Sequence, residues 1–261
     1  MIPSLTIPLA VVVLLIILER TIPFVRSEFL RRYFKTDIFY MVTGFGGGGW
    51  LAVSYVSTMT DWIAPYLGVL KGSHVGFAAS VLIAVVFLDI GNYLAHMLLH
   101  RYDVLWEFRK AHHSSRKLDW LATFRSHIVE QLLRRIFAPV LLIIFGLTPE
   151  VVAVAGGLFI AWGIFNHSNL AIRLPWLEWL FITPALHRAH HVSASADQNL
   201  GTVFSLWDRV RGTLVQGEVY PDTVMGIPGE VETYPQSWGP QFIQPFQMIA
   251  AEMNRESRIP G

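Results

Sequence analysis

The chain has 261 residues, of which 53% are hydrophobic and only 15% charged, with a mean hydropathy of +0.44. Soluble globular domains carry about a quarter charged residues, so this composition favours a protein whose surroundings are lipid. A formal net charge of +1 gives no basic signal for nucleic acid, and the absence of cysteine excludes disulfides, iron–sulfur clusters and thiolate nucleophiles.

Apolar segments long enough to cross a membrane begin at the N-terminus. Residues 1–18 carry no charge. Because their start is neutral and the run ends at Glu19 and Arg20, we predict a retained transmembrane helix and not a cleaved secretory signal. Residues 38–60 form a second uncharged stretch, and a third runs from 72 to 88 and continues with rising polarity to 100.

Two further apolar segments form a hairpin. They cover residues 127–147 and 151–167, and the first has a short apolar core, so we expect it to span partly or to tilt. Residues 220–261 are rich in proline and glycine, which predicts an irregular cytosolic segment with a short closing helix over 245–253. The sequence thus predicts an all-α integral membrane protein with a single domain over 1–261. We expect about four to five transmembrane helices and a cytosolic, histidine-rich helical cap.

The charges of the loops predict an orientation. Five basic residues lie between the first two apolar segments, whereas only Lys71 lies between the second and third. Six more follow the third segment, and cytoplasmic loops are the ones enriched in Lys and Arg. We therefore expect a multi-pass protein with its histidine-rich segments on the cytoplasmic side. The residues concerned are Arg20, Arg26, Arg31, Arg32 and Lys35, then Arg101, Arg109, Lys110, Arg116, Lys117 and Arg125.

Eight of the ten histidines gather beside the apolar segments. Two are spaced i, i+4 and three read H-x-x-H-H, spacings that place imidazoles on one face of a helix. Eight imidazoles match about four ligands for each of two metals. Such ligands suit iron, zinc or copper better than magnesium or calcium, and spacing does not choose among the three. The eight are His96, His100, His112, His113, His167, His187, His190 and His191.

An ordered set of motifs covers residues 89–213. It reads D-I-G-N-Y-L-A-H, A-H-H-S-S, N-H-S-N, H-R-A-H-H and W-D-R-V-R-G-T in chain order. The set resembles the fatty acid hydroxylase/sterol desaturase superfamily of membrane enzymes. The resemblance implies a non-haem di-iron centre of two Fe ions, with the eight histidines as ligands, although another metal such as zinc can occupy it in isolated protein. It also implies dioxygen, a lipid substrate from the bilayer that is hydroxylated or desaturated, and a separate electron-donor protein.

One position departs from the family pattern. The family usually reads H-x-x-H-H in its first loop, but Arg109 stands at the leading position, and a guanidinium does not ligate a metal. The missing ligand is dispensable, or His127 takes its place, or the site has lost a metal and its activity. We prefer the first explanation because eight histidines remain. His74, in a short loop, is interpreted as an ordinary loop residue.

Two carboxylates are candidates for supporting roles. Asp89 precedes His96 by seven residues and so shares its helical face, where it either accepts a ring N–H of a ligand or pairs with an Arg or Tyr. Asp208 is expected to pair with Arg125 or another arginine, in a structural role.

Other functional classes stay open at this point. A histidine-rich metal transport or sensing protein fits the composition, but the ligands gather at one face and do not form a path across the bilayer. A catalytically inactive lipid-binding relic is kept open by Arg109. The H-E-x-x-H motif of zinc proteases is absent from the sequence.

Overall fold

The structure is a computed structural model of the chain that describes residues 3–28, 30–44, 75–192 and 197–256, with single residues and pairs between 51 and 66. Within these ranges all named elements are helices, and β-structure is confined to three isolated bridges. The all-α prediction is therefore confirmed. The elements are α1 (Pro3–Thr21), α2 (Phe34–Thr43), α4 (Phe77–Arg101), α5 (Asp103–His113), η2 (Ala122–Phe124), α6 (Ile128–Leu133), α7 (Phe137–Ile144), α8 (Pro149–Asn166), α9 (Pro184–His191), α10 (Leu206–Arg211) and α11 (Trp238–Glu256).

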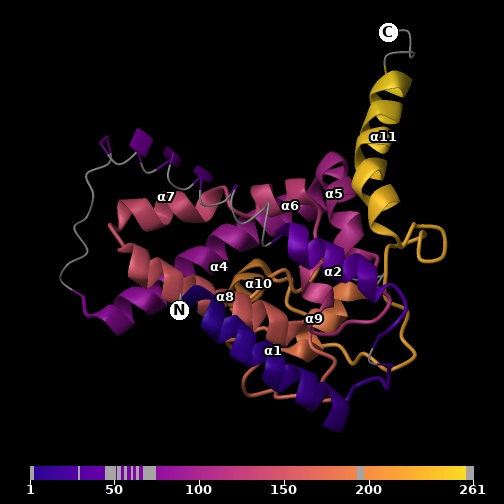
Figure 1. Cartoon of the computed structure of the whole chain (residues 1–261), viewed down its shortest axis with the longest axis horizontal. Helices are drawn as coiled ribbons and strands as arrows, with labels where there is room; N and C mark the ends of the chain where they lie inside the picture. The colour runs from indigo at the N-terminus through magenta and orange to yellow at the C-terminus, as the bar shows by residue number, and fades with distance from the viewer. Residues whose placement is uncertain are drawn as a thin grey trace.

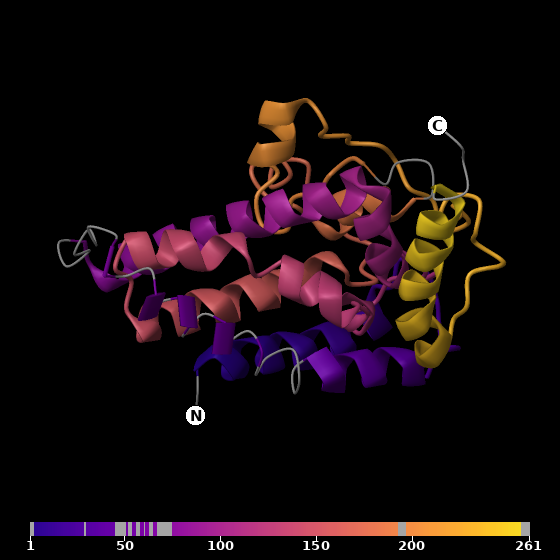
Figure 2. The ribbon, with the colours of Figure 1, turned by 90° about the horizontal axis from the view of Figure 1, so that it is seen from above.

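The long helices α1, α4 and α8 and the shorter α7 run along the long axis of the molecule, and α11 stands across one end (Figures 1 and 2). The helix α4 packs against α7 and α8, and α8 also packs against α1. Small residues on α4 and α8, such as Ala84 and Ala155, let these helices approach closely, and both are fully buried in one apolar core. Leu15 of α1 joins a second core with Ile164.

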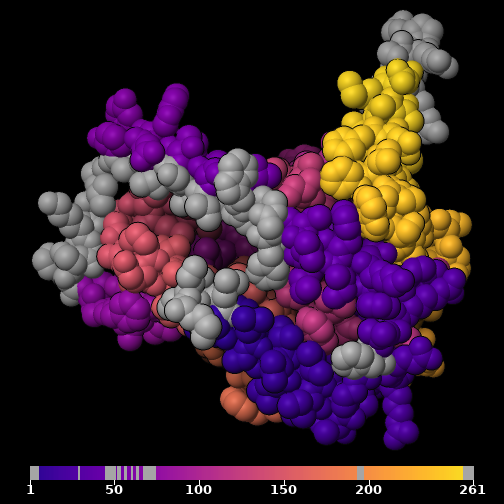
Figure 3. All heavy atoms as spheres, in the orientation of Figure 1, coloured from indigo at the N-terminus to yellow at the C-terminus, as the bar shows by residue number. Residues whose placement is uncertain are grey.

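Two of the described helices, α4 and α8, are long and apolar enough to cross a membrane. The 19-residue α1 lies on the face seen in Figure 3 and exposes aliphatic side chains, among them Leu9, Val13 and Ile17. Exposed apolar surface of this kind is typical of contact with lipid or with a partner. The count of four to five crossings stays a prediction, because most of residues 45–74 lies outside the described residues. This range includes much of the second apolar segment and also His74, which is not described.

The fourth apolar segment is not one helix. A turn over residues 134–136 separates α6 from α7, and Arg134 bends back to bond Glu130 and Asn92. Because α7 has only eight residues, it extends for about 12 Å, far short of the roughly 30 Å of a hydrocarbon core. This geometry agrees with the expectation that the segment spans only partly, and Arg134, which pairs with Glu130, lies at the break.

The C-terminal part is more regular than predicted. The helix α11 begins at Trp238, seven residues before the expected closing helix, and continues to Glu256 with Pro245 inside it. Its Phe242 and Phe246 rings pack against the rings of His127 and Phe108. These ring contacts pack one face of α11 against the rest of the protein, which the frequency of proline in the sequence did not indicate. The irregular segment therefore ends at residue 237.

At Gly91 the helices α4 and α7 approach each other closely. A β-carbon on Gly91 would lie 2.7 Å from the backbone nitrogen of Ala138 and 2.9 Å from its Cα. Both are backbone atoms, so the clash is relieved only if a helix moves.

We expect Gly91→Ala to destabilise the protein by about 1–3 kcal/mol, because an added methyl overpacks this contact. The matched control is Gly156→Ala on α8, where a β-carbon meets nothing within 4 Å. That change removes a helical glycine at no steric cost, so stability is expected to rise by up to about 1 kcal/mol. Thermal unfolding of the two variants in detergent tests this, and equal effects would contradict the close contact.

Candidate metal centre

Four helices bring the eight histidines to one end of the bundle. His96 and His100 lie in the last two turns of α4, and His112 and His113 end α5. His167 follows α8 directly. The remaining three occupy α9, a short helix that Thr183 caps by accepting from the backbone N–H of Leu186, with Pro184 at its first position. The cap fixes where α9 starts and therefore which face its H-x-x-H-H sequence presents.

The histidines form two groups of four, in each of which the ring nitrogens lie within 4.8 Å of one another. Seven of the eight histidines are buried, and the side chain of the eighth, His100, is only 2% exposed. The groups adjoin each other, since the rings of His113 and His191 stack with their centroids 4.6 Å apart. We call them group A (His96, His100, His113 and His190) and group B (His112, His167, His187 and His191).

Backbone carbonyls set the tautomer of four of these imidazoles. The Nδ1 atoms of His96, His112, His167 and His190 lie 2.7, 3.0, 2.7 and 2.8 Å from the carbonyl oxygens of Leu200, Arg125, Gly163 and Gln198. A carbonyl only accepts, so each Nδ1 carries the hydrogen and each Nε2 is left with a lone pair. This is the arrangement in which histidine ligates a metal through Nε2.

The nitrogens of group B fit a bound transition metal. The Nε2 atoms of His112 and His167 are 3.1 Å apart, those of His167 and His187 are 2.9 Å apart, and those of His187 and His191 are 3.2 Å apart. Because His112 and His167 hold their protons on Nδ1, two lone pairs face each other, an arrangement that a cation relieves. Four nitrogens around a tetrahedral metal at about 2.0–2.1 Å are about 3.3–3.4 Å apart, close to these separations.

Group A also offers free nitrogens. Among the described residues, the Nε2 atoms of His100 and His190 and both ring nitrogens of His113 have no hydrogen-bond partner although they are buried. Buried polar atoms are seldom left unsatisfied, so this set too fits a cation.

Burial lowers the pKa of the histidines that follow α4. The pKa values of His112, His113, His187, His190 and His191 lie well below 6.5, first because the charged form loses its hydration and then because neighbouring imidazoles and Arg109 add positive charge. The same burial lowers the pKa of His167 to about 3. All six rings are therefore neutral at pH 7 and hold lone pairs for a metal.

Arg109 lies directly beside group A. Its Nη2 donates to the Nε2 of His96 at 2.7 Å, and its Nη1 forms a buried ion pair with Glu130. The carboxylate of Glu130 also accepts from the Nε of Arg134 at 3.1 Å. Arg109 thus faces the Nε2 of a group A histidine from the position where the family usually has a histidine.

His127 does not take the place of the missing histidine. Its Nδ1 accepts from the backbone N–H of Val129 at 3.2 Å and so caps α6, while its Nε2 lies 3.1 Å from the carbonyl of Phe242. With both nitrogens engaged and neither group including it, His127 acts structurally.

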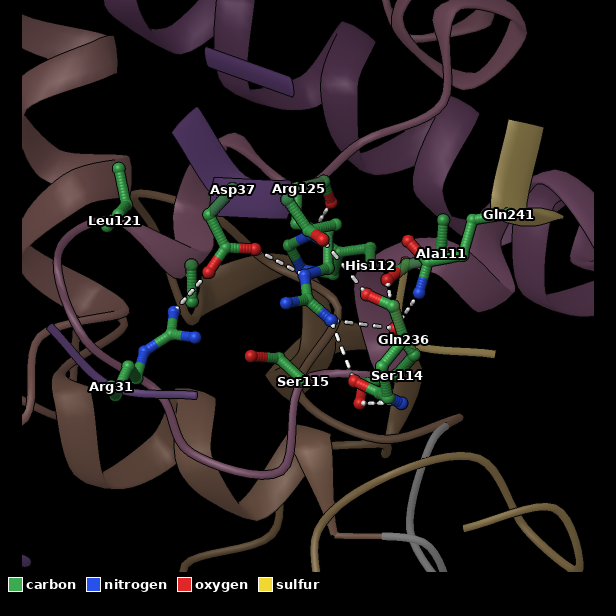
Figure 4. Close-up of polar contacts among 12 residues, drawn as sticks. Arg31, Asp37, Ala111, His112, Ser114, Ser115, Leu121, Arg125, Gln236 and Gln241 are labelled. Carbon is green, nitrogen blue, oxygen red and sulfur yellow. Dashed lines mark hydrogen bonds and ion pairs between the residues drawn. The ribbon is translucent and has the colours of Figure 1, made fainter. Parts of the chain in front are cut away.

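A polar network, shown in Figure 4, holds the segment that positions His112. The carboxylate of Asp37 on α2 binds the guanidinium groups of both Arg31 and Arg125. Arg125 also donates to Ser114 Oγ and to Gln236 Oε1, each at 3.1 Å. Since the carbonyl of Arg125 accepts from His112, this network fixes the orientation of a group B imidazole.

Both candidate carboxylates bind chiefly to backbone N–H groups. Asp89 accepts from the N–H groups of Val203 and Phe204 and from the indole of Trp207, and among the described residues it accepts from no histidine or arginine, contrary to expectation. Asp208 accepts from the N–H groups of Leu200 and Gly201 and not from Arg125. Both anchor the loop whose Leu200 carbonyl accepts from His96, so their role is to position that loop.

Sequence reasoning missed Asp37 and Glu130. A signal existed for Glu130, because an acidic residue and two arginines within one apolar segment require partners. For Asp37 only its place at the edge of an apolar stretch was informative, and nothing pointed to Arg125, 88 residues away.

The fatty acid hydroxylase family model matches residues 81–213, half of the chain. The chain belongs to the fatty acid hydroxylase family. This segment of the family member contains all eight histidines, Arg109 and the loop anchored by Asp89 and Asp208.

Relatives with established names share this region. The chain is 32% identical over 171 residues to ornithine lipid hydroxylase OlsE of Rhizobium tropici, which covers 65% of the chain and 51% of the relative. It is 27% identical over 164 residues to alkylglycerol monooxygenase of Danio rerio, covering 62% and 35%. The human alkylglycerol monooxygenase is 29% identical over 133 residues, covering 50% and 29%. The match thus spans about half or less of these relatives. No solved structure is significantly similar to the chain.

The low pKa values predict acid instability of the metal-free protein. The folded state binds fewer protons than the unfolded state once the pH falls below about 6.5, so stability is lost from there downward and is unaffected above. For His167 the loss reaches on the order of 2 kcal/mol at pH 5. Chemical unfolding of chelator-treated protein at pH 7, 6 and 5 measures it, and His167→Gln should lower the slope by about one proton. A stability that is constant from pH 7 to 5 would contradict the buried neutral imidazoles.

Asp37→Asn is expected to cost about 3–5 kcal/mol, because it leaves the buried Arg125 guanidinium without a carboxylate partner. The variant should also lower metal content, since the Arg125 carbonyl orients His112. The matched control is Glu218→Gln, which breaks the exposed pair with Arg173 at a cost below about 1 kcal/mol. Unfolding and metal analysis of both variants test the network, and an Asp37 variant as stable as the control would refute it.

Proposed function

We propose that this chain is an integral membrane lipid hydroxylase, which binds two iron ions through groups A and B and uses dioxygen and electrons from a separate donor protein. The observation that carries the proposal is the convergence of eight imidazoles, seven of them buried, into two groups of four. Family membership and the two named kinds of relative, a lipid hydroxylase and alkylglycerol monooxygenases, support the reaction class.

We propose hydroxylation over desaturation because the named relatives are a hydroxylase and monooxygenases. In the reaction a C–H bond of the lipid is broken and a C–O bond is formed with one atom of dioxygen. The other oxygen atom leaves as water, which takes up two electrons from the donor protein and two protons. Bound iron supplies the one-electron redox chemistry that lets dioxygen react with an unactivated C–H bond.

The protein's own residues prepare the site for that chemistry. The carbonyls of Leu200, Arg125, Gly163 and Gln198 hold the Nδ1 protons, so the rings keep their Nε2 lone pairs directed inward. Burial keeps the imidazoles uncharged and excludes bulk water. The absence of cysteine from the chain also leaves no thiolate near the centre that an oxidant would attack.

We place the protein across a membrane as a multi-pass protein, with the centre at the cytoplasmic side. The apolar α4 and α8 each end at the histidine groups, so the same ends of both helices face one surface. The basic loop that follows α1 supports the cytoplasmic assignment. A lipid substrate then reaches the centre from the bilayer.

The competing functions find less support. A metal transporter needs an exchangeable site with a path, whereas the histidines of group B are all buried and pack directly on one another. An inactive lipid-binding protein would not need the lone pairs of His112 and His167 to face each other at 3.1 Å.

The test uses the full chain purified in detergent and supplied with iron, total membrane lipid, an electron-donor system and ¹⁸O₂. We expect two irons per chain, lipid-dependent oxygen consumption and one ¹⁸O atom in the product. His187→Ala and His191→Ala should lose metal and reduce activity to background, whereas Glu218→Gln, at an exposed residue that contacts Arg173 and Tyr220, should retain both. Near-zero bound metal in the wild type would overturn the proposal.

A further inference from the structure

A hydrogen bond from an arginine distinguishes group A from group B. In group A the Nη2 of Arg109 lies 2.7 Å from the Nε2 of His96, whereas no arginine donates to a ring nitrogen of group B among the described residues. Arg109 is 1% exposed, so its hydrogen bond to His96 is shielded from competing water.

His96 has only one lone pair to offer. Its Nδ1 lies 2.7 Å from the Leu200 carbonyl, which only accepts, so the ring hydrogen is on Nδ1. The Nε2 lone pair then accepts from Arg109. A nitrogen whose lone pair accepts a hydrogen bond does not bind a metal at the same time, so group A presents three available histidines and group B presents four.

The Arg109 guanidinium is held in place by one buried carboxylate, that of Glu130. Glu130, which is fully buried, forms the ion pair with Arg109 and also accepts from Arg134. Arg134 in turn donates to Asn92 Oδ1 at 2.8 Å, one turn before His96 on α4. Moving Arg109 away from His96 therefore disturbs a buried charge network. A divalent cation in group A is also repelled by the positive charge of Arg109.

We infer that the two groups are metal sites of unequal affinity, with Arg109 as a positioning residue that competes with metal for His96. The inference rests on the proposed metal function and deepens it. Group B binds the first metal ion tightly. Group A binds a second ion through His100, His113 and His190, about 10–100-fold more weakly, the range typical for loss of a partner that orients a ligand. The weakly bound ion in group A is therefore the first to dissociate when metal is scarce.

Titration of chelator-treated full chain in detergent with Co²⁺ tests the inference, because the visible absorption of Co²⁺ reports nitrogen ligation at each equivalent. The wild type should bind one equivalent tightly and a second 10–100-fold more weakly. His187→Ala should remove the tight phase and His100→Ala the weak phase. These two variants keep the test independent of whether any Arg109 variant folds.

Arg109→Met frees the His96 lone pair, and Glu130 keeps Arg134 as its partner. The second phase should then tighten 10–100-fold and merge with the first, and Arg109→His, which restores the family pattern, should do the same. The matched control is Arg134→Gln, which removes a guanidinium from the same carboxylate without a contact to His96. It should leave the two phases separate.

Two equal phases in the wild type, or an unchanged second phase in Arg109→Met, would overturn the inference while leaving the metal function intact. A merging of the phases in Arg134→Gln would also overturn it, because net charge and not the bond to His96 would then set the difference. Absence of any tight Co²⁺ binding in the wild type would instead overturn the proposed function, and with it this inference.

Discussion

The centre depends on fixing one proton on each imidazole. A neutral histidine points a lone pair inward only if its other nitrogen donates elsewhere, and here backbone carbonyls accept from His96, His112, His167 and His190. Those carbonyls must themselves be held in place. Asp208 binds the N–H groups around Leu200, and Asp37 holds the side chain of Arg125. Asp208 and Asp37 therefore act on the histidines through the backbone carbonyls and not by direct contact.

The same logic joins distant parts of the chain to the centre. The C-terminal segment reaches Ser114, the neighbour of His113, through Gln241, whose amide donates to its hydroxyl at 2.9 Å, and through Gln236, whose amide donates to its carbonyl at 3.1 Å. The loop before α2 joins the network through Arg31, which pairs with Asp37 and Asp119. Gln241, Gln236 and Arg31 all lie outside the residues that the family model matches, 81–213, and their partners Ser114 and Asp119 lie inside them. The matched segment therefore carries the eight histidines, and the flanking segments hold part of it in place.

The sequence predicted the histidines because their chemistry resides in the side chains and their spacing is helical. It did not predict which carbonyls accept from them, since every residue has a carbonyl and only the fold selects four. The break at residues 134–136 was partly foreseeable from its charges, whereas the length of α11 depended on rings such as Phe242 that pack onto His127. Arg109 was visible in the sequence as a departure, but its bond to His96 required the three-dimensional structure.

Asp89 carries a consequence for how the protein is made. Its carboxylate lies within the apolar α4, and its partners begin 114 residues later at Val203. At a synthesis rate of about 5–20 residues per second, those partners emerge on the order of ten seconds after the helix. During that interval the acid has none of its native N–H donors, and an unpartnered carboxylate in an apolar helix is costly. The final packing of α4 around Asp89 therefore forms only after residues 203–207 have been synthesised.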